Sequence, residues 1–448
     1  MKSDDGDAMR QSFAAFAPCG RPLKDKIKVG LKTDDRAAES TVAASDPLVH
    51  WVGRTMSGAE LGSGAPTAVF FDWEGVSASV NVKNYTYLTV KIADNCLGGG
   101  ARWAVSMTTS DTYRSTTQHR ISTFLTASQI SDYVLFNLPG GWKSCNPLCN
   151  KVDSNTTRFT LTRLTESRLS GCGAAHNLSV ASFATDGIFS AAPPDFHHET
   201  SSAPHIHHNV VPAAPRPAPH KVRRLEFIGD SITAGDLDDG GSVYGGGHDI
   251  ICANSAFNDD VLYSTGGVLC SYALGFDAEC MYSAWGGIRL GGMTFGNQKQ
   301  RGMVELYPYT FSTNGSPHNH PWDFSRFPAD AVVINLGTNG GWSQNTSDGS
   351  QAWRDSYAKF ASDIALKHYK QPKLPLFLAF GPMDSGPKSY EVPLLAVVKT
   401  LQAQGIAAHA LNLTLDHSMT GCYGHPSHDD HVEIAAKAKP QLTQVLGW

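Results

Sequence analysis

The sequence lacks several features that mark common protein classes. No run of eighteen apolar residues occurs among its 448 residues, so we expect no membrane-spanning helix. Charged residues make up only 17% and the net charge is −5, which argues against nucleic acid as the main partner. The N-terminus has no basic start followed by an apolar core, so no signal peptide is visible. These absences favour a soluble globular protein, which we expect to be a monomer without membrane or nucleic-acid partners.

The cysteines give little support for a zinc site. Cys145 and Cys149 are the only closely spaced pair among nine cysteines, whereas structural zinc sites usually need two such pairs. We therefore expect no metal. Apart from Cys19, the cysteines fall four to each half of the chain, which permits two disulfides in each half; buried thiols of a cytosolic protein are the alternative. These eight are Cys96, Cys145, Cys149, Cys172, Cys252, Cys270, Cys280 and Cys422.

Asparagine sequons, like the even division of the cysteines, favour a secreted protein. Six N-x-S/T sequons begin at Asn84, Asn155, Asn177, Asn314, Asn345 and Asn412. Sequons are glycosylated only in the secretory pathway, where disulfides also persist. The two patterns together predict a secreted glycoprotein whose leader is not visible in this chain.

The chain divides into four segments by composition, and its length favours two cores. Residues 1–45 are polar and without periodicity, which indicates a disordered tail. Residues 46–190 hold short β-rich runs separated by Gly, Asn, Asp and Ser, which is typical of a β-sandwich. Residues 191–221 form a Pro- and His-rich linker, whose histidines we interpret as solvated rather than as a metal site. Residues 222–448 alternate strand-like and helix-like runs, which predicts an α/β domain with a largely parallel sheet.

Polar and glycine-rich motifs follow the predicted strands of the α/β domain. The first is GDSITAG, which places Ser231 directly after an apolar strand; the others contain Gly287, Asn339 and His425. Active sites of such sheets form at the carboxyl ends of strands, so we expect these residues to converge. A serine, a histidine and aimed hydrogen-bond donors are the groups that acyl transfer needs. A turn serine with a structural role is the simpler alternative for Ser231.

These four motifs, in this order, resemble the SGNH (GDSL) hydrolase superfamily. Within it the chain resembles carbohydrate esterase family 2, through Gly53-Arg54, the stretch FDWEGV at residues 71–76, GDSITAG, INLGTNGG, GCYGHPSHDDH and the terminal LGW. The resemblance implies a flavodoxin-like three-layer α/β domain preceded by an all-β jelly roll. It implies deacetylation of plant-type polysaccharides such as acetylated xylan or glucomannan, without a cofactor. Ser231 then matches the nucleophile, His425 the base, and Ser231, Gly287 and Asn339 the oxyanion donors.

Two positions depart from the family pattern. Tyr423 stands where an Asp often precedes the histidine by two residues, and Gly340 stands where an Asp usually follows the asparagine. We therefore predict a Ser231–His425 dyad in which a main-chain carbonyl of the loop before His425 orients the imidazole. Asp429 and Asp430 fall in the first turn of the last predicted helix, where acidic residues complement the helix dipole without a catalytic role.

Aromatic residues near the predicted site are candidates for a sugar platform. We name Trp285, Trp342 and Tyr423 as substrate-binding residues, with Trp322 as a further candidate and core packing as the alternative for Trp285. Two other functions stay open: a lipid or aryl esterase of the GDSL group, and a carbohydrate-binding protein with a degenerate esterase domain.

Overall fold

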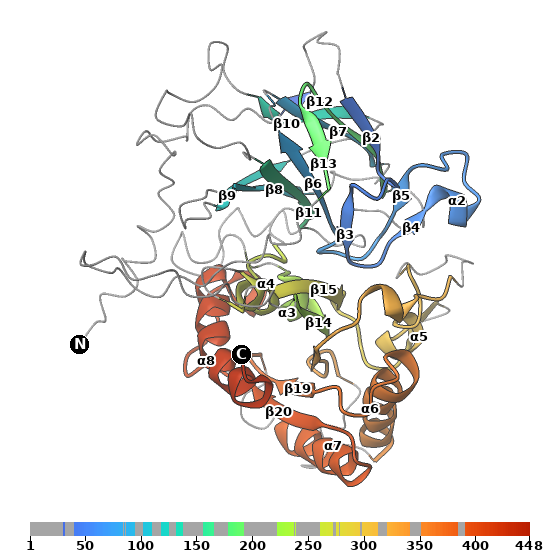
Figure 1. Ribbon diagram of the computed structural model, residues 1–448. Helices are drawn as coiled ribbons and strands as arrows, with labels where there is room; N and C mark the ends of the chain where they lie inside the picture. Colours follow the sequence, from blue (N-terminus) through green and yellow to red (C-terminus); the bar gives the residue numbers. More distant parts are fainter. Residues whose placement is uncertain are drawn as a thin grey trace, which may run out of the picture.

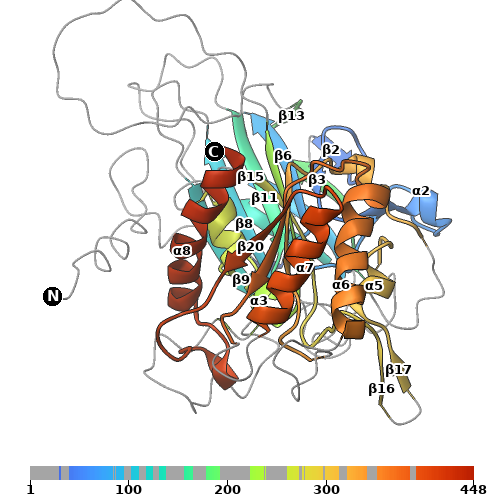
Figure 2. The ribbon, with the colours of Figure 1, turned by 90° about the horizontal axis from the view of Figure 1, so that it is seen from below.

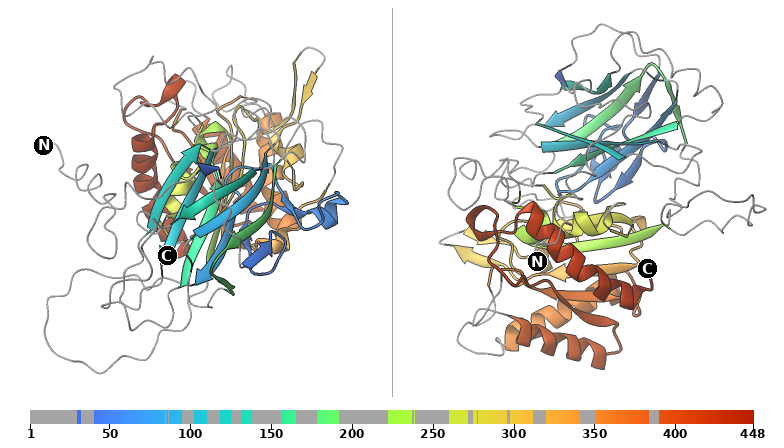
Figure 3. Two further views of the ribbon diagram at one scale, coloured as in Figure 1. Left: turned by 90° about the horizontal axis from the view of Figure 1, so that it is seen from above. Right: turned by 90° about the vertical axis from the view of Figure 1, so that its left-hand side faces the viewer.

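The computed structural model describes the chain in segments, and its two parts lie one above the other (Figure 1). An all-β part precedes an α/β part, and Figure 3 shows the β part seated over one side of the α/β part. Among the described residues no helix has the length and apolar character to cross a membrane. The described residues are 30–31, 40–83, 85, 87–94, 102–109, 118–124, 131–137, 156–164, 178–191, 222–236, 238, 260–271, 275–276, 278–295, 298–311, 320–340, 351–383 and 390–448.

The β part consists of two sheets in which every described pairing is antiparallel. Apolar residues of both sheets, such as Val80 and Val82 from one and Leu88 and Val90 from the other, belong to one core cluster. One sheet contains β1 (Gly30–Leu31), β2 (Ser40–Ala43), β4 (Met56–Ser57), β5 (Val69–Phe70), β7 (Tyr87–Asp94), β10 (Ser131–Asn137) and β12 (Leu178–Thr185). The other contains β3 (His50–Val52), β6 (Ser77–Lys83), β8 (Arg102–Thr109), β9 (Gln118–Phe124), β11 (Thr156–Arg163) and β13 (Ile188–Ser190).

Two strands lie inside the segment that we expected to be a disordered tail. β1 pairs with β10, and β2 pairs with β12. Both are too short for a sequence pattern to show, because their pairing depends on partners about 100 to 145 residues away along the chain. The β part therefore starts before residue 46. The short helix α2 (Gly58–Leu61) was also not expected; Ser57 and Glu60 form its capping box.

The α/β part is built on five parallel strands, as the alternating pattern predicted. They are β14 (Arg223–Gly229), β15 (Ala278–Ala284), β18 (Ala331–Asn335), β19 (Leu376–Phe380) and β20 (Ala408–Asn412), in the spatial order β15-β14-β18-β19-β20. Numbered along the chain this order is 2-1-3-4-5, that of flavodoxin-like doubly wound sheets. The chain changes direction between β14 and β18, so a ligand site is expected where these two strands end.

Helices cover both faces of this sheet (Figure 2). Side chains alternate along β14: Leu225 and Phe227 join the core under one set of helices, and Ile228 joins the core under the other. The first set contains α4 (Thr265–Cys270) and α8 (His428–Leu446), and the second contains α6 (Gln351–Asp363), its continuation η6 (Ile364–His368) and α7 (Glu391–Ala403). The remaining elements are α3 (Ser231–Ala234), α5 (Met303–Leu306), the pair β16 (Met293–Phe295) and β17 (Gln298–Gln300), and the single turns η5 (Phe324–Arg326) and η8 (Cys422–Gly424).

An arginine from the β part is buried against the α/β part. Arg54 has no exposed surface, and its guanidinium donates to the carboxylate of Glu226 on β14 at 3.1 Å. It also donates to the main-chain carbonyls of Tyr307 and Tyr309 and lies over aromatic rings that include Tyr307 and Trp322. Glu226 accepts three further hydrogen bonds, from Ser283, Tyr307 and Tyr369. The Gly53-Arg54 motif therefore joins the two parts.

Candidate active site

The motif GDSITAG forms a tight turn from β14 into α3. Gly229 is required because a Cβ there would lie 2.0 Å from Oγ1 of Thr233 and 2.8 Å from the carbonyl oxygen of Asn335. Asp230 caps α3 by accepting a hydrogen bond from the main-chain N–H of Ile232. Gly235 ends the helix at φ 69°, a left-handed conformation that favours glycine. The turn places Ser231 as the first residue of α3, at the switch point of the sheet.

Ser231 and His425 lie within hydrogen-bond distance of each other, although 194 residues separate them in the sequence. Oγ of Ser231 is 3.1 Å from Nε2 of His425. Ser231 is 4% exposed, whereas His425 is half-buried. Of the two side chains, the histidine is therefore the one that reaches the protein surface. This geometry is that of a hydroxyl nucleophile with its general base.

The motifs that contain Gly287 and Asn339 contact each other, and the strands before both motifs end level with β14. Gly229 of β14 is in register with Ala284 of β15 and with Asn335 of β18, so both following loops begin level with the Ser231 turn. The side-chain amide of Asn339 donates to the main-chain carbonyl of Ile288 at 3.0 Å. One amide N–H is thus used to fix the side chain, and the amide has a second N–H for another acceptor.

The loop before α8 holds His425 by its main chain. The N–H of His425 donates to the carbonyl of Cys422 at 3.0 Å, and its own carbonyl accepts from the N–H of Gly421 at 2.9 Å. A Cβ on Gly421 would lie 2.6 Å from that carbonyl oxygen, so glycine is required there. Tyr423 adopts φ 53° and ψ 30°, a left-handed conformation that is uncommon for a residue with a side chain, and it is 69% exposed.

The orientation of the imidazole differs from our expectation. Nδ1 of His425 is buried, and no hydrogen-bond partner lies near it among the described residues. No described main-chain carbonyl forms a hydrogen bond with Nδ1, so the expected orientation by a carbonyl of this loop is not observed. The exposed side chain of Tyr423 does not serve Nδ1 either.

Two of the candidate platform residues are buried. Trp285 is 6% exposed and Trp322 is 5% exposed, and both belong to the main hydrophobic core. Trp322 lies over the guanidinium of Arg54. Their burial favours core packing over a sugar platform, because a strand-end position does not fix which way a ring points. Trp342 lies outside the described residues, which leaves Tyr423 as the exposed aromatic next to His425.

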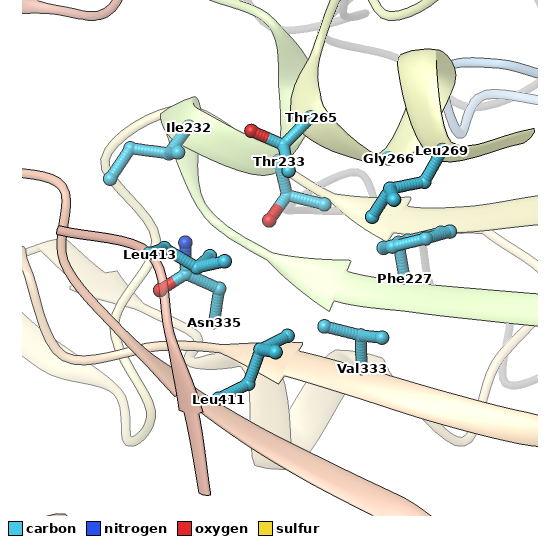
Figure 4. Close-up of a pocket in the computed structure, with 10 residues that line it drawn as sticks. All are labelled: Phe227, Ile232, Thr233, Thr265, Gly266, Leu269, Val333, Asn335, Leu411 and Leu413. Atoms are coloured by element: carbon cyan, nitrogen blue, oxygen red, sulfur yellow. The ribbon is translucent and has the colours of Figure 1, made fainter. Parts of the chain in front are cut away.

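A small cavity lies behind the nucleophile turn (Figure 4). Its volume is about 20 Å³, which is room for about one water-sized sphere. Side chains from α3, α4 and the sheet surround it, among them Ile232, Thr233, Leu269 and Asn335. Neither Ser231 nor His425 lines it, so it is a gap in the packing beneath the site and not the place where Ser231 meets a substrate.

The described residues contain a disulfide but no group of side chains suited to hold a metal. No cluster of three His, Cys, Asp or Glu side chains suited to a metal occurs within the described segments. Cys270 and Cys280 form a disulfide with a Cα–Cα distance of 6.2 Å, and Cys422 is also disulfide-bonded. The other cysteines, and all the sequons except that of Asn412, lie outside the described residues. Asn412 ends β20, and its side chain accepts hydrogen bonds from Thr414 of its own sequon.

Comparisons with known proteins found relatives both in sequence and in structure. No family model matches the chain. "Cellulase/esterase CelE" of Acetivibrio thermocellus is 29% identical over 245 residues, 53% of this chain and 27% of that protein. An "Acetylxylan esterase / glucomannan deacetylase" of Cellvibrio japonicus is 24% identical over 227 residues, 50% of this chain and 58% of that protein. The solved structure of a family two carbohydrate esterase from Cellvibrio japonicus matches with a TM-score of 0.62 and 20% identity, covering 91% of this chain and 98% of that chain.

The fold is therefore that of a doubly wound α/β part with a β part before it. The chain shares this fold with carbohydrate esterases of family two and is similar in sequence to curated proteins named as a cellulase/esterase and as an acetylxylan esterase, which confirms the resemblance that its motifs predicted. The chain spans 27% of the length of the Acetivibrio thermocellus protein and 58% of the length of the Cellvibrio japonicus protein.

Proposed function

We propose that this protein removes O-acetyl groups from plant-type polysaccharides or oligosaccharides through an acyl-serine intermediate. The observation that supports this most directly is the 3.1 Å contact between Oγ of Ser231 and Nε2 of His425 at the switch point of the sheet. Relatives named as acetylxylan esterase or glucomannan deacetylase favour acetylated xylan and glucomannan as substrates. The two antiparallel sheets are proposed to form the jelly-roll domain expected before such a catalytic domain.

In the first half of the proposed reaction, Oγ of Ser231 attacks the carbonyl carbon of the acetyl ester while its proton passes to Nε2 of His425. The developing oxyanion accepts hydrogen bonds from the main-chain N–H groups of Ser231 and Gly287 and from the second amide N–H of Asn339. The tetrahedral intermediate collapses to the acetyl-serine, and the proton on His425 passes to the departing sugar hydroxyl.

In the second half, a water molecule attacks the acetyl-serine and His425 takes its proton. The new tetrahedral intermediate uses the same oxyanion donors, and its collapse releases acetate and returns the proton to Oγ of Ser231. No step in this scheme needs a metal or an organic cofactor. Tyr423 is proposed to contact the sugar, because its exposed ring lies two residues from His425 and aromatic rings stack well on pyranose faces.

Acetate release from a panel of acetylated polysaccharides tests the proposal. Ser231→Ala is expected to abolish release while folding, followed by circular dichroism, is unchanged. His425→Ala is expected to lower turnover by about 10²- to 10⁴-fold because it removes the general base. Retention of more than a few per cent of activity by Ser231→Ala would exclude the acyl-serine scheme. Comparing acetyl with octanoyl esters in the same assay separates this function from that of a lipid esterase, which would prefer the longer chain.

We also propose that the protein is secreted. The Cys270–Cys280 disulfide supports this, because structural disulfides persist mainly in oxidising compartments. Counting free thiols by mass spectrometry of natively produced protein tests the proposal: few free thiols are expected, whereas eight or nine would place the protein in a reducing compartment.

A further inference from the structure

One carboxylate oxygen accepts hydrogen bonds from both ends of the loop that contains His425. Oδ2 of Asp430 accepts hydrogen bonds from the main-chain N–H of Thr420 at 2.6 Å, from the Thr420 hydroxyl at 2.9 Å and from the main-chain N–H of Ser427 at 2.9 Å. Asp430 is almost fully buried, which strengthens these charge-assisted bonds. Residues 420 and 427 are therefore fastened to one point, and His425 lies between them.

Capping of α8 accounts for only part of this arrangement. Ser427 and Asp430 form the capping box of α8, and the box uses the Ser427 N–H and the Asp430 N–H. The two bonds from Thr420 are not part of any cap, because Thr420 lies ten residues before Asp430 and outside the helix. The Thr420 and Ser427 hydroxyls also contact each other at 2.7 Å, which closes the loop a second time.

The helix that bears Asp430 is itself fixed to the core. His431, the next residue, is fully buried, and its Nδ1 accepts hydrogen bonds from the main-chain N–H and the hydroxyl of Thr265 at the start of α4. The carboxylate of Asp430 is thus held by a helix, α8, that is itself fixed to α4. Inside the loop, the main chain of His425 is held by Cys422 and Gly421, while Nδ1 of its imidazole has no partner among the described residues. The position of the base depends on the loop.

We propose that Asp430 is a positioning residue for His425: it fixes the loop 420–427 so that Nε2 of His425 stays within reach of Oγ of Ser231. The inference rests on the proposed function, because it takes His425 as the base. It differs from a triad acid in that the carboxylate holds main-chain and hydroxyl donors of the loop rather than the imidazole itself.

Asp430→Ala removes the acceptor of all three bonds. A displacement of the base by about 1 Å can cost about 10²-fold in rate, so we expect kcat to fall by about 10- to 100-fold with KM within about threefold of the parent value. Asp430→Asn retains a carbonyl oxygen in the same place and should stay within about tenfold of the parent rate. Asp429→Ala is the matched control, because Asp429 is an exposed acid in the same helical turn, and its removal should leave kcat unchanged.

A fluorophosphonate probe that labels the nucleophilic serine separates positioning from loss of fold. Displacement of His425 lowers the rate constant of labelling while the final labelled fraction stays complete, whereas partial unfolding lowers the fraction and leaves the rate constant of the folded part unchanged. Should Asp430→Ala not fold, Thr420→Val removes one of the three donors at an exposed residue and should slow labelling by about three- to tenfold, the factor expected for one hydrogen bond at a solvent-exposed position.

The outcomes separate the two proposals. If Ser231→Ala still labels and releases acetate, the proposed function fails. If Ser231→Ala is inactive but Asp430→Ala and Thr420→Val label at the parent rate, the function stands and the positioning role of Asp430 is overturned. Slower labelling of Asp430→Ala and Thr420→Val, with Asp429→Ala at the parent rate, supports it.

Discussion

Replacement of Arg54 by methionine should destabilise the protein more than a typical surface substitution. Arg54 is fully buried and joins the β part to Glu226 on the nucleophile strand. The change leaves Glu226 as a buried charge without its cation. It also removes the N–H groups that donate hydrogen bonds to the main-chain carbonyls of Tyr307 and Tyr309. Breaking a buried ion pair in this way costs about 3–5 kcal/mol of unfolding free energy.

Arg326 supplies a matched control in the same interface. It donates to the carbonyl of Thr55 and lies over the ring of Trp322, but it is exposed. Arg326→Met should therefore cost less than about 1 kcal/mol. Glu226→Gln combined with Arg54→Met removes both charges and should be more stable than Arg54→Met alone, since the remaining hydroxyl donors can still bond the amide oxygen.

Urea unfolding followed by circular dichroism measures these differences. A loss of less than about 1 kcal/mol for Arg54→Met, equal to that of Arg326→Met, would refute the reasoning. So would a double variant no more stable than the single one, because the cost would then not come from the uncompensated charge of Glu226.

Three further predictions concern the site and its surroundings. Asn339→Ala should lower turnover by about 10²-fold if its amide binds the oxyanion, and an unchanged kcat would remove it from the site. Tyr423→Asp should preserve or raise turnover while weakening sugar binding, measured as kcat and KM on acetylated oligosaccharide; a collapse of kcat at unchanged KM would show that the tyrosine serves the chemistry. Burial lowers the pKa of His431 to about 3, so the unfolded chain binds an extra proton between pH 6.5 and pH 3, and stability should fall by about 1.4 kcal/mol per pH unit as the pH drops through that window. His431→Gln should flatten that slope in urea titrations at pH 7 and pH 5, and an unchanged slope would contradict this assignment.

The sequence predicted that Ser231 and His425 would converge because strand-end rules are local. A glycine-bounded turn after an apolar strand can be read in a few residues, and parallel strands bring their carboxyl ends to one edge whatever the loops contain. The same reasoning could not place β2 or β9. β2 has four residues and pairs with β12 far along the chain, whereas β9 is adjacent to its partner β8 but is largely polar, so its composition does not indicate a strand.

The contacts that sequence reasoning missed depend on how separate segments of the chain pack together. Arg54 was visible only as part of a motif, and nothing local indicates that its partner is Glu226, 172 residues later. The sequence left Trp285 open between core packing and a sugar platform, because the side of a strand end on which a ring packs depends on the neighbouring layer. Thr420 carries no signal in sequence for its contact with Asp430, since the loop between them can close in many ways.

The absence of a family-type Asp at position 423 has a structural counterpart. Tyr423 is exposed in a left-handed conformation, Asp429 is exposed, and Asp430 is occupied by three donors of the loop. No described carboxylate is therefore placed to hold the imidazole of His425 by Nδ1. A base without such a partner keeps its direction only if its main chain is rigid. The loop 420–427 supplies that rigidity through Asp430, so substitutions that loosen the loop should cost catalysis more than the removal of any single exposed acid nearby.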